Sequence, residues 1–258
     1  MENNHQSVAI MFSGGTDSLA LMSMAVKKQL PGLEKLKQVH LMYMLNGMSR
    51  YPSFPRERFK ICKELLKGQY GSGTDFPELK YVEIDSARLF QGLWLDHYEE
   101  LMPRYNGKNM VCVACKIAMH AQSIVYCKRN KISTFLTGYA KKQSYYPEQT
   151  PTFMNRLKEF SKNFDIETLY PVFEMFTDET VSRHYLEDNG LPSTGGGERA
   201  CMFSQTYTTA EESDTEKFLN ESLPQTSKYL KAILDNQLNV AASYFPPGRV
   251  KGKLINNL

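Results

Sequence analysis

The sequence predicts an α/β fold, a doubly wound and mostly parallel five-stranded sheet with a small helical appendage at the C-terminus. An apolar run that begins at Val8 ends in a Gly-Gly turn and is followed by apolar residues at helical spacing. Residues 39–45 form a continuous apolar run, as expected for a strand that is covered on both faces. Strands and helices then alternate along the chain with short turns, which is typical of parallel sheets.

Each element follows from its local pattern, taken in chain order. The first strand leads into a helix at 18–28, which is apolar almost all round and ends near Pro31. Amphipathic spacing predicts the helices, and β-rich or alternating runs predict the strands. The further strands are expected at 39–45, 80–85, 132–137 and 168–173, and the further helices at 54–67, 88–102, 116–130, 211–219 and 226–242.

Length and composition predict one main domain over residues 1–205, which carries the sheet, and a helical appendage over 206–258. With 258 residues, 41% of them hydrophobic, the chain is long enough to bury a full core. We find no apolar run of membrane-spanning length and no signal peptide, so we expect a cytoplasmic protein with no membrane partner. Five cysteines, an odd number, suit a reducing compartment better than a disulfide framework.

Basic residues gather in one part of the chain although the net charge is only +3. Between Arg104 and Lys158 lie ten basic residues and one acid, Glu148. Basic and aromatic side chains interleaved in this way favour an RNA-contacting surface, and a solvated basic face over core aromatics is the alternative. The basic residues are Arg104, Lys108, Lys116, Lys128, Arg129, Lys131, Lys141, Lys142, Arg156 and Lys158, and the aromatic ones are Tyr105, Tyr126, Tyr139, Tyr145, Tyr146 and Phe153.

The turn after the first strand has the composition of an anion-binding loop. Gly14 and Gly15 let the backbone approach a ligand, and the following helix offers unpaired N–H groups at its N-terminus. Ser13 and Ser18 add hydroxyl donors. A carboxylate at Asp17 makes sense beside a phosphate if Mg²⁺ bridges the two, or if the aspartate orders the loop as a cap.

The segment Ser13-Gly14-Gly15-Thr16-Asp17-Ser18 matches neither the Walker A nor the dinucleotide-binding pattern. It resembles the SGGxDS signature of the PP-loop ATP pyrophosphatases, which split ATP between its α and β phosphates and adenylate a substrate. The resemblance implies that this segment binds ATP with Mg²⁺, that Asp17 and Ser18 take part in catalysis, and that adenine lies near Met44. A glycine turn that merely starts a helix is the alternative.

The cysteines suggest a second half of the site. Cys112 and Cys115 form a CxxC pair just before the helix predicted at 116–130, and Cys201 follows a glycine-rich run. Three thiolates with an open position suit an iron–sulfur cluster, whereas a closed structural zinc needs a fourth ligand, for which Cys127 and His120 are candidates. A redox pair or simple structural thiols would also account for these cysteines.

The order of elements is similar to the tRNA-thiolating branch of the PP-loop superfamily. The similarity runs from the loop through the CxxC pair, Thr137-Gly138-Tyr139, residues 169–172 and on to Cys201. It implies an adenine nucleotide alpha hydrolase-like fold, a [4Fe-4S] cluster on the three cysteines, and ATP contacts at Gly138. It also implies tRNA or a nucleobase-like molecule as acceptor, a sulfur donor and a homodimer as partners.

These inferences together predict an enzyme that adenylates a carbonyl oxygen, releases pyrophosphate and then transfers sulfur. Lys142 would neutralise charge at the transferred phosphorus, and a surface charge is the alternative. Two different functions stay open. One is amidation by a zinc enzyme similar to 7-cyano-7-deazaguanine synthase, although the chain has no further cysteine after Cys201. The second is a regulatory protein that holds ATP without turnover.

Overall fold

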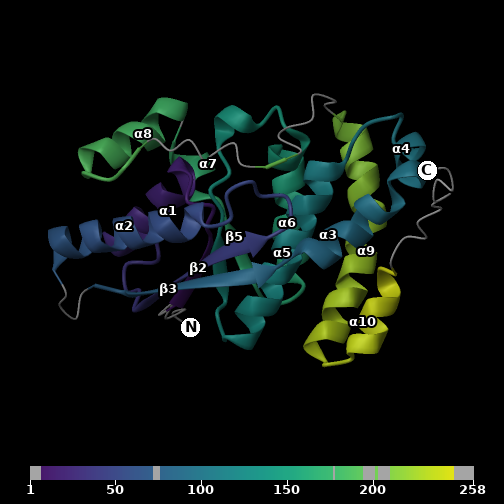
Figure 1. The fold of residues 1–258 in the computed structure, drawn as a ribbon, viewed down its shortest axis with the longest axis horizontal. Helices are drawn as coiled ribbons and strands as arrows, with labels where there is room; N and C mark the ends of the chain where they lie inside the picture. The colour runs from purple at the N-terminus through teal and green to yellow at the C-terminus, as the bar shows by residue number, and fades with distance from the viewer. Residues whose placement is uncertain (1–6, 72–75, 177, 194–200, 203–209, 247–258) are drawn as a thin grey trace, which may run out of the picture.

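The centre of the molecule is a parallel β-sheet (Figure 1). Over residues 7–71, 76–176, 178–193, 201–202 and 210–246, which the computed structural model describes, five strands pair in the order β3-β2-β1-β4-β5. The strands are β1 (Ser7–Met11), β2 (Gln38–Leu45), β3 (Glu78–Asp85), β4 (Thr134–Leu136) and β5 (Glu167–Leu169). Every pair is parallel, which confirms the predicted doubly wound sheet.

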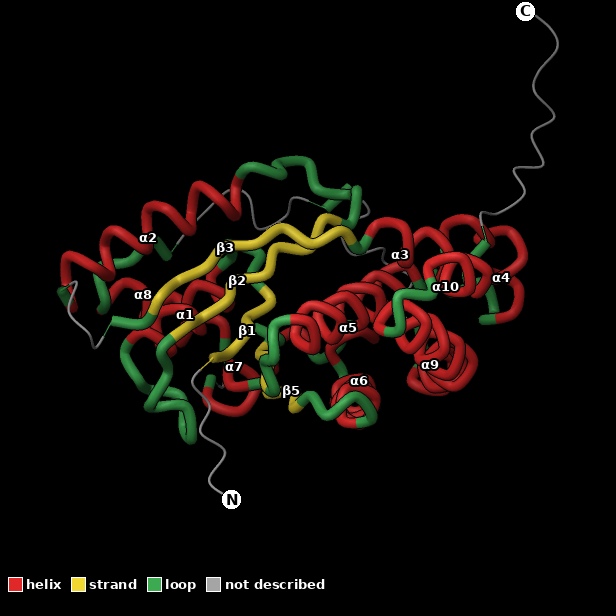
Figure 2. Tube along the Cα trace, turned by 90° about the horizontal axis from the view of Figure 1, so that it is seen from below, coloured by secondary structure: helices red, strands yellow, loops and turns green. Residues whose placement is uncertain are grey.

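Helices cover both faces of the sheet. Figure 2 shows α1, α2, α7 and α8 on one side and α3, α5 and α6 on the other, with α9 and α10 outside α5. In chain order they are α1 (Thr16–Val26), α2 (Phe54–Tyr70), α3 (Ala87–Leu93), α4 (Tyr98–Arg104), α5 (Val111–Arg129), α6 (Pro151–Lys162), α7 (Pro171–Met175), α8 (Glu179–Asp188), α9 (Glu212–Leu234) and α10 (Leu238–Tyr244). The short 3₁₀ helices within the described residues are η1 (Leu95–His97), η2 (Lys141–Gln143) and η3 (Pro147–Gln149).

Alternation along the strands creates two separate cores. In β1, Val8 and Ile10 join the core under α1 and α2, whereas Ala9 and Met11 join the core under α5. Successive side chains of a strand point to opposite faces, so a central strand needs apolar residues at every position. The continuous apolar character of β1 and β2 therefore follows from helices on both sides.

Two predicted elements have different boundaries in the structure, and in each case a single residue accounts for the difference. The strand predicted at 168–173 is wrong beyond Leu169, because Pro171 starts α7, where its missing N–H costs nothing. The helix predicted at 88–102 breaks at Trp94, whose backbone leaves the helical region (φ −144°, ψ −57°). The Trp94 side chain is fully buried there against Tyr105 and Phe218.

The C-terminal helices also differ from the prediction. Helices expected at 211–219 and 226–242 are instead one long helix, α9, which runs through Pro224, followed by the short α10. The segment around Pro224 stays helical because Leu219, Leu223 and Leu230 are buried in the core under α5. The break falls at Asn236, which adopts a left-handed conformation (φ 58°). The domain division at residue 205 stays a prediction, since residues 203–209 lie outside the described part.

Candidate functional site

The loop after β1 and the start of α1 form a close-packed turn at the carboxyl edge of the sheet. The N–H of Phe12 donates to the carbonyl of Met42 (2.8 Å), which fixes where the loop leaves the sheet. Gly14 has a φ of +76°, and a Cβ at this position would lie 2.9 Å from the Cα of Pro55 at the start of α2. Only glycine fits there, for both reasons. Gly15 is the N-cap of α1 and has no side chain to accept from the first-turn N–H groups.

The hydroxyl groups of the loop bond to the loop itself. The N–H of Gly15 donates to Ser13 Oγ (3.2 Å), and Ser18 Oγ donates to the carbonyl of Gly15 (3.0 Å). Ser13 Oγ and Ser18 Oγ lie 3.2 Å apart. Because the one proton of Ser18 goes to the carbonyl, Ser13 must donate to Ser18. Ser13 is exposed and Ser18 is buried (4% exposed), so Ser13 is the hydroxyl of this pair that faces solvent.

Side chains from distant segments hold the loop from outside. Ser182 of α8 donates to Asp17 Oδ1 over 2.6 Å, which fixes the orientation of that carboxylate. The Thr16 hydroxyl donates to the carbonyl of Ser193 (3.2 Å), so the chain after α8 also contacts the start of α1. The buried Arg58 of α2 donates from Nε to the carbonyl of Gly14 (3.4 Å) and from Nη2 to the carbonyl of Pro192 (2.9 Å).

Arg58 and Ser182 were not among the residues that the sequence predicts for the site. Ser182 lies 165 residues beyond Asp17, and Arg58 lies 44 residues beyond Gly14. Neither position carries a local motif, and only the packing of α8 and α2 against the β1 loop brings them there. A buried arginine is unusual, but its burial is not visible in the sequence.

The chain after β4 closes the other side of the loop. A Cβ at Gly138 would lie 3.2 Å from the carbonyl carbon and Cβ of Asp17 and from the backbone N of Ser18. The backbone of Gly138 therefore passes directly over the start of α1. Strands β1 and β4 are neighbours at which the chain reverses its direction of winding, and such switch points are where ligands bind in open parallel sheets. The Thr137 hydroxyl is buried here and has no partner within the described residues.

The cysteines lie near the end of β2. Cys112 and Cys115 are inside α5, which begins at Val111, so the prediction that the pair precedes its helix is wrong. The Asn46 side chain, just after β2, donates to Cys115 Sγ (3.4 Å). Cys201 pairs with Ser49 in an antiparallel bridge, and the next N–H donates to the carbonyl of Met48 (2.8 Å). The turn after β2 therefore brings the third cysteine to the first two.

The thiols lie close enough to influence one another's charge. Burial raises the pKa of Cys112, and negative charge on Glu148, Cys115 and Cys201 raises it further. Burial also raises the pKa of Cys115 to about 11, although the Asn46 hydrogen bond and the positive charge of Lys116 oppose the shift. Without a cation the Cys112 and Cys115 thiols are protonated at neutral pH. Within the described residues, no three His, Cys, Asp or Glu side chains are arranged to hold a metal ion.

The two candidate fourth ligands lie elsewhere. Cys127 is fully buried near the end of α5, roughly 18 Å along the helix from Cys115 at 1.5 Å per residue. His120 is also fully buried, and its Nε2 lies 2.8 Å from the Tyr139 hydroxyl. Its Nδ1 has no partner in the part of the chain that the structure describes. Neither side chain completes a zinc site with the three cysteines.

Glu148 lies beside the cysteines and was not among the predicted site residues. It belongs to η3, which packs against α5, and its side chain is buried (6% exposed). Burial raises its pKa, while its own backbone N–H, the positive charge of Lys116 and a hydrogen bond from the Cys112 thiol lower it. As the one acid in the basic stretch it was visible in the sequence, but its burial was not.

Two further predicted site residues have less defined places. Met44 is buried in β2 and belongs to the core under α5, so an adenine ring near it would contact the end of the strand rather than this side chain. Lys142 lies half-buried in η2, and η2 packs against α7. Their roles as nucleotide neighbour and catalytic cation stay predictions.

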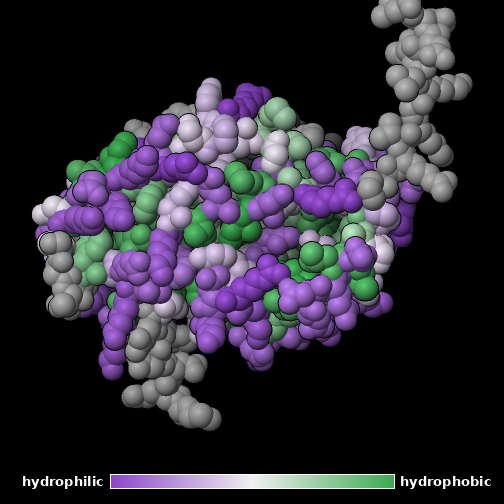
Figure 3. Space-filling view, turned by 60° about the horizontal axis from the view of Figure 1, so that its bottom comes forward, coloured by the Kyte–Doolittle hydropathy of each residue, from purple (hydrophilic) through white to green (hydrophobic). Residues whose placement is uncertain are grey.

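The predicted RNA-contacting surface is largely dispersed by the fold. Tyr105, Tyr139 and Phe153 are buried, and Arg104 and Lys128 form ion pairs with Glu221 and Asp165. Arg156 and Arg129 bond to groups of α9. In the space-filling view hydrophilic side chains cover most of the visible face, and hydrophobic ones appear between them in groups (Figure 3). A solvated basic face over core aromatics therefore fits most of these residues better than an RNA surface does.

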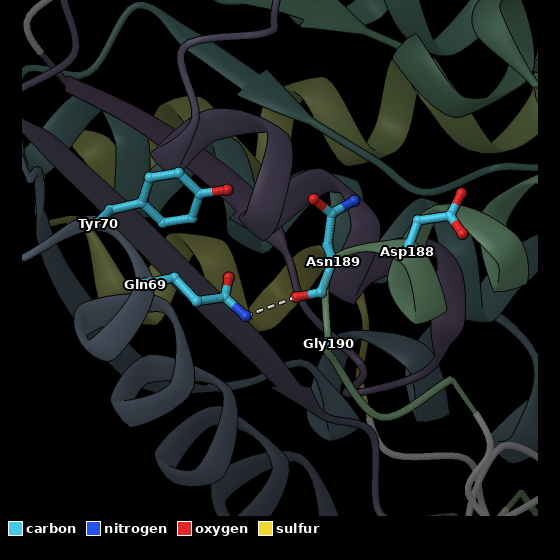
Figure 4. Close-up of a pocket in the computed structure, with 5 residues that line it drawn as sticks. All are labelled: Gln69, Tyr70, Asp188, Asn189 and Gly190. Atoms are coloured by element: carbon cyan, nitrogen blue, oxygen red, sulfur yellow. Dashed lines mark hydrogen bonds between the residues drawn. The ribbon is translucent and has the colours of Figure 1, made fainter.

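A shallow hollow lies away from this site. Gln69 and Tyr70 at the end of α2 line it together with Asp188, Asn189 and Gly190 at the end of α8 (Figure 4). Gln69 Nε2 donates to the carbonyl of Asn189 across it (2.7 Å). The 17 residues of α2 span roughly 25 Å, and its opposite end contacts Gly14, so the hollow is remote from the β1 loop.

Fold and site together define a doubly wound α/β protein with a glycine-containing loop at its switch point and three cysteines at the same edge. No protein-family model matches the chain, and no curated protein matches it. Among solved structures the chain is similar to the U34-tRNA thiolase NcsA from Methanococcus maripaludis with its [4Fe-4S] cluster. The two are 16% identical, with a TM-score of 0.45, over 92% of this chain and 74% of that thiolase. No helix in the described ranges is long and apolar enough to cross a membrane.

Proposed function

We propose that this chain is an adenylating ATP pyrophosphatase that activates a carbonyl oxygen of a tRNA base or related nucleobase and then replaces that oxygen with sulfur. The observation that carries the proposal is the shared position of two half-sites. The Ser13–Ser18 segment follows β1, and the turn that contacts Cys115 and Cys201 follows the neighbouring strand β2. Both half-sites therefore open at the carboxyl edge of the sheet.

The β1 loop supplies the groups that the first step requires. The N-terminus of α1 presents N–H groups and a partial positive charge to a triphosphate. Carboxylate and hydroxyl oxygens are the ligands that Mg²⁺ prefers, and Asp17 and the exposed Ser13 provide them beside that N-terminus. Mg²⁺, when bound, would neutralise charge on the phosphates. Ser182 holds the Asp17 carboxylate in a fixed orientation, so the position of this ligand is set before ATP binds.

In the first step the substrate carbonyl oxygen attacks the α phosphorus, and the bond to pyrophosphate breaks. Pyrophosphate leaves and the substrate carries an AMP ester. The Gly138 backbone and the α1 N-terminus position the α phosphate, and Lys142 offsets charge at the transferred phosphorus. In the second step a sulfur nucleophile attacks the activated carbon, and AMP leaves with the original carbonyl oxygen.

The chemistry of the three cysteines fits a metal centre that is bound by thiolates. The Asn46 side chain donates to Cys115, negative charge on Cys201 acts on both Cys112 and Cys115, and burial keeps these two thiols protonated until a cation arrives. Three thiolates with an open position suit an iron–sulfur cluster, whereas a closed structural zinc needs a fourth ligand. Cys112, Cys115 and Cys201 would hold a [4Fe-4S] cluster. When bound, such a cluster supplies an iron with an open coordination position where sulfur can be held.

Pyrophosphate release tests the first step. Wild-type protein with Mg²⁺, ATP and bulk tRNA or free nucleobases should release pyrophosphate, and the Asp17→Ala variant should release little. Asp188→Ala is the matched control, because Asp188 is exposed at the end of α8, remote from the loop. With acceptor labelled by ¹⁸O at its carbonyl, the label should appear in AMP. Label-free AMP would mean that water attacks ATP, and no pyrophosphate with any acceptor would overturn the adenylation.

Iron analysis tests the second half-site. After anaerobic purification the wild-type chain should carry about four irons, as a [4Fe-4S] cluster requires. Cys112→Ala and Cys201→Ala should lose them, whereas Cys127→Ala should keep them, because Cys127 lies far along α5. Stoichiometric zinc without iron would overturn the cluster and favour amidation chemistry.

A further inference from the structure

The backbone at Gly138 and Tyr139 is not held by hydrogen bonds of its own. Residues 137–140 follow β4 and belong to no helix or strand. The N–H of Thr137 donates to a carbonyl of β5 (3.2 Å), and the N–H of Ala140 donates to a side chain of η3 (3.1 Å). Between these two bonds, neither Gly138 nor Tyr139 has a backbone hydrogen bond to a described residue. Side-chain contacts must therefore fix this part of the chain.

The Tyr139 side chain supplies that anchor. It is buried in the core under α5 and stacks on the ring of Tyr170, with 5.6 Å between centroids and 13° between planes. Its hydroxyl shares a hydrogen bond of 2.8 Å with Nε2 of His120, which is fully buried in α5. The ammonium of Lys116, also in α5, lies 5.2 Å from the centre of the same ring. The phenol is therefore tied to α5 at its hydroxyl and packed against a second ring.

This anchor acts on the residue that meets the β1 loop. Gly138 is bonded covalently to Tyr139, and a Cβ at Gly138 would lie 3.2 Å from the carbonyl carbon of Asp17 and from the backbone N of Ser18. The proposed function places the α phosphate between the Gly138 backbone and this N-terminus of α1. Because the Tyr139 ring lies in the core, it can influence that space only through the position of the backbone next to it.

We propose that Tyr139, held by His120, is a positioning residue that sets the place of the Gly138 backbone against the start of α1. The rate measurement that tests this inference rests on the proposed function, and the structural measurement does not. A misplacement of about 1 Å can lower the rate of a reaction roughly 100-fold. Loosening Tyr139 should therefore slow adenylation more than it weakens ATP binding, because Ser182 and Arg58 still hold the β1 loop.

Removal of single hydroxyl groups tests this role. Tyr139→Phe loses the hydrogen bond to His120 and keeps the ring. Tyr170→Phe is the matched control, because its hydroxyl is lost from the same buried pair of rings but donates to the carbonyl of Met154 in α6 (2.9 Å). We expect the kcat for pyrophosphate release to fall roughly tenfold in Tyr139→Phe while the KM for ATP changes less than about twofold. Both constants should keep their wild-type values in Tyr170→Phe.

A double-mutant cycle tests whether His120 acts through this hydrogen bond. His120→Leu should lower kcat as much as Tyr139→Phe does, and the two changes together should lower it no further than either alone. His120→Gln, which can still reach the hydroxyl, should keep more of the rate than His120→Leu. Additive losses in the double variant would overturn the link between the two side chains. His120→Leu also provides the test if Tyr139→Phe does not fold.

The backbone of Gly138 can be observed without any turnover. The chain has 16 glycines, so ¹⁵N-glycine labelling gives a simple NMR spectrum in which Gly138→Ala identifies the Gly138 signal. That signal should move in Tyr139→Phe and in His120→Leu, and should stay in place in Tyr170→Phe. An unmoved signal or an unchanged kcat in Tyr139→Phe, or equal changes in Tyr170→Phe, would overturn the positioning role. If the signal moves as expected but wild type releases no pyrophosphate, the adenylation is overturned and the role of Tyr139 in placing Gly138 stands.

Discussion

Metal-free protein should lose stability as the pH falls below 6.5, and His120 should account for the loss. His120 is fully buried, and its ring packs edge-on against Phe135 with 5.2 Å between centroids. Burial, and then the positive charge of Lys116, lower its pKa from 6.5 to about 3. The neutral ring satisfies Nε2 through Tyr139, and the structure offers no described partner for a second N–H at Nδ1.

Proton linkage gives the sign and the size of the change in the free energy of unfolding with pH. Between pH 6.5 and about 3 the unfolded chain binds a proton at this histidine and the folded chain does not. The stabilising contribution is therefore fully present above 6.5 and falls by roughly 1.4 kcal/mol for each pH unit below it. Two units below 6.5, the penalty reaches about 3 kcal/mol.

Urea unfolding of wild type and His120→Gln across this pH range provides the assay. Glutamine can still reach the Tyr139 hydroxyl but does not titrate, so the variant should be less stable than wild type near neutral pH and lose less on acidification. Glu148, whose pKa is raised, contributes in the opposite direction, but it is present in both proteins and cancels in the difference. Equal pH slopes for the two proteins would refute the assignment to His120.

Three further substitutions test the packing around the loop and the core. Gly138→Ala should lower pyrophosphate release at least tenfold without unfolding the protein, because its Cβ would meet the start of α1 at 3.2 Å; unchanged kinetics with ATP would contradict the close approach. Ser182→Ala removes a hydrogen bond to a carboxylate worth about 1.5–3 kcal/mol, and should raise the KM for Mg²⁺–ATP more than it lowers kcat. Phe218→Ala should cost about 3–5 kcal/mol in urea unfolding, since Phe218 fills the space between Trp94 and Tyr105. A cost near zero would mean that α9 is not part of the core.

Local chemistry allowed the sheet and the β1 loop to be predicted. The strand, the Gly-Gly turn and the apolar helix follow one another within 20 residues, and the structure places the turn at Gly14, where φ is positive. Strand β2 was also evident, because His40 is the one polar residue in an otherwise apolar run from Val39 to Leu45. Elements that depend on residues close together in the sequence can be predicted without a structure.

Sequence patterns mislead where long-range packing decides the outcome. Two separate helices were predicted at 211–219 and 226–242, yet burial of Leu219 and Leu223 in the core under α5 keeps α9 continuous through Pro224. Interleaved basic and aromatic residues indicated an RNA surface, but Tyr105, Tyr139 and Phe153 are buried in the core and Tyr145 is left exposed. Burial of Glu148 depends on η3 docking on α5, which has no local signal.

The two half-sites differ in how completely folding orders their residues before a ligand binds. Gly138, Ser182 and Arg58 hold the β1 loop from three sides, so the cost of ordering this loop is met during folding rather than when ATP binds. Cys112 and Cys115 are positioned but protonated, and a cation must displace their protons before they become ligands. Loss of the metal should therefore leave ATP binding intact, whereas a change at Gly138 should weaken adenylation even in a protein with its full complement of iron. The packing explains this difference between the two half-sites. The position of the β1 loop does not depend on the cysteines. The cysteines, in contrast, depend for their positions on the turn after β2 and on the chain around Glu148.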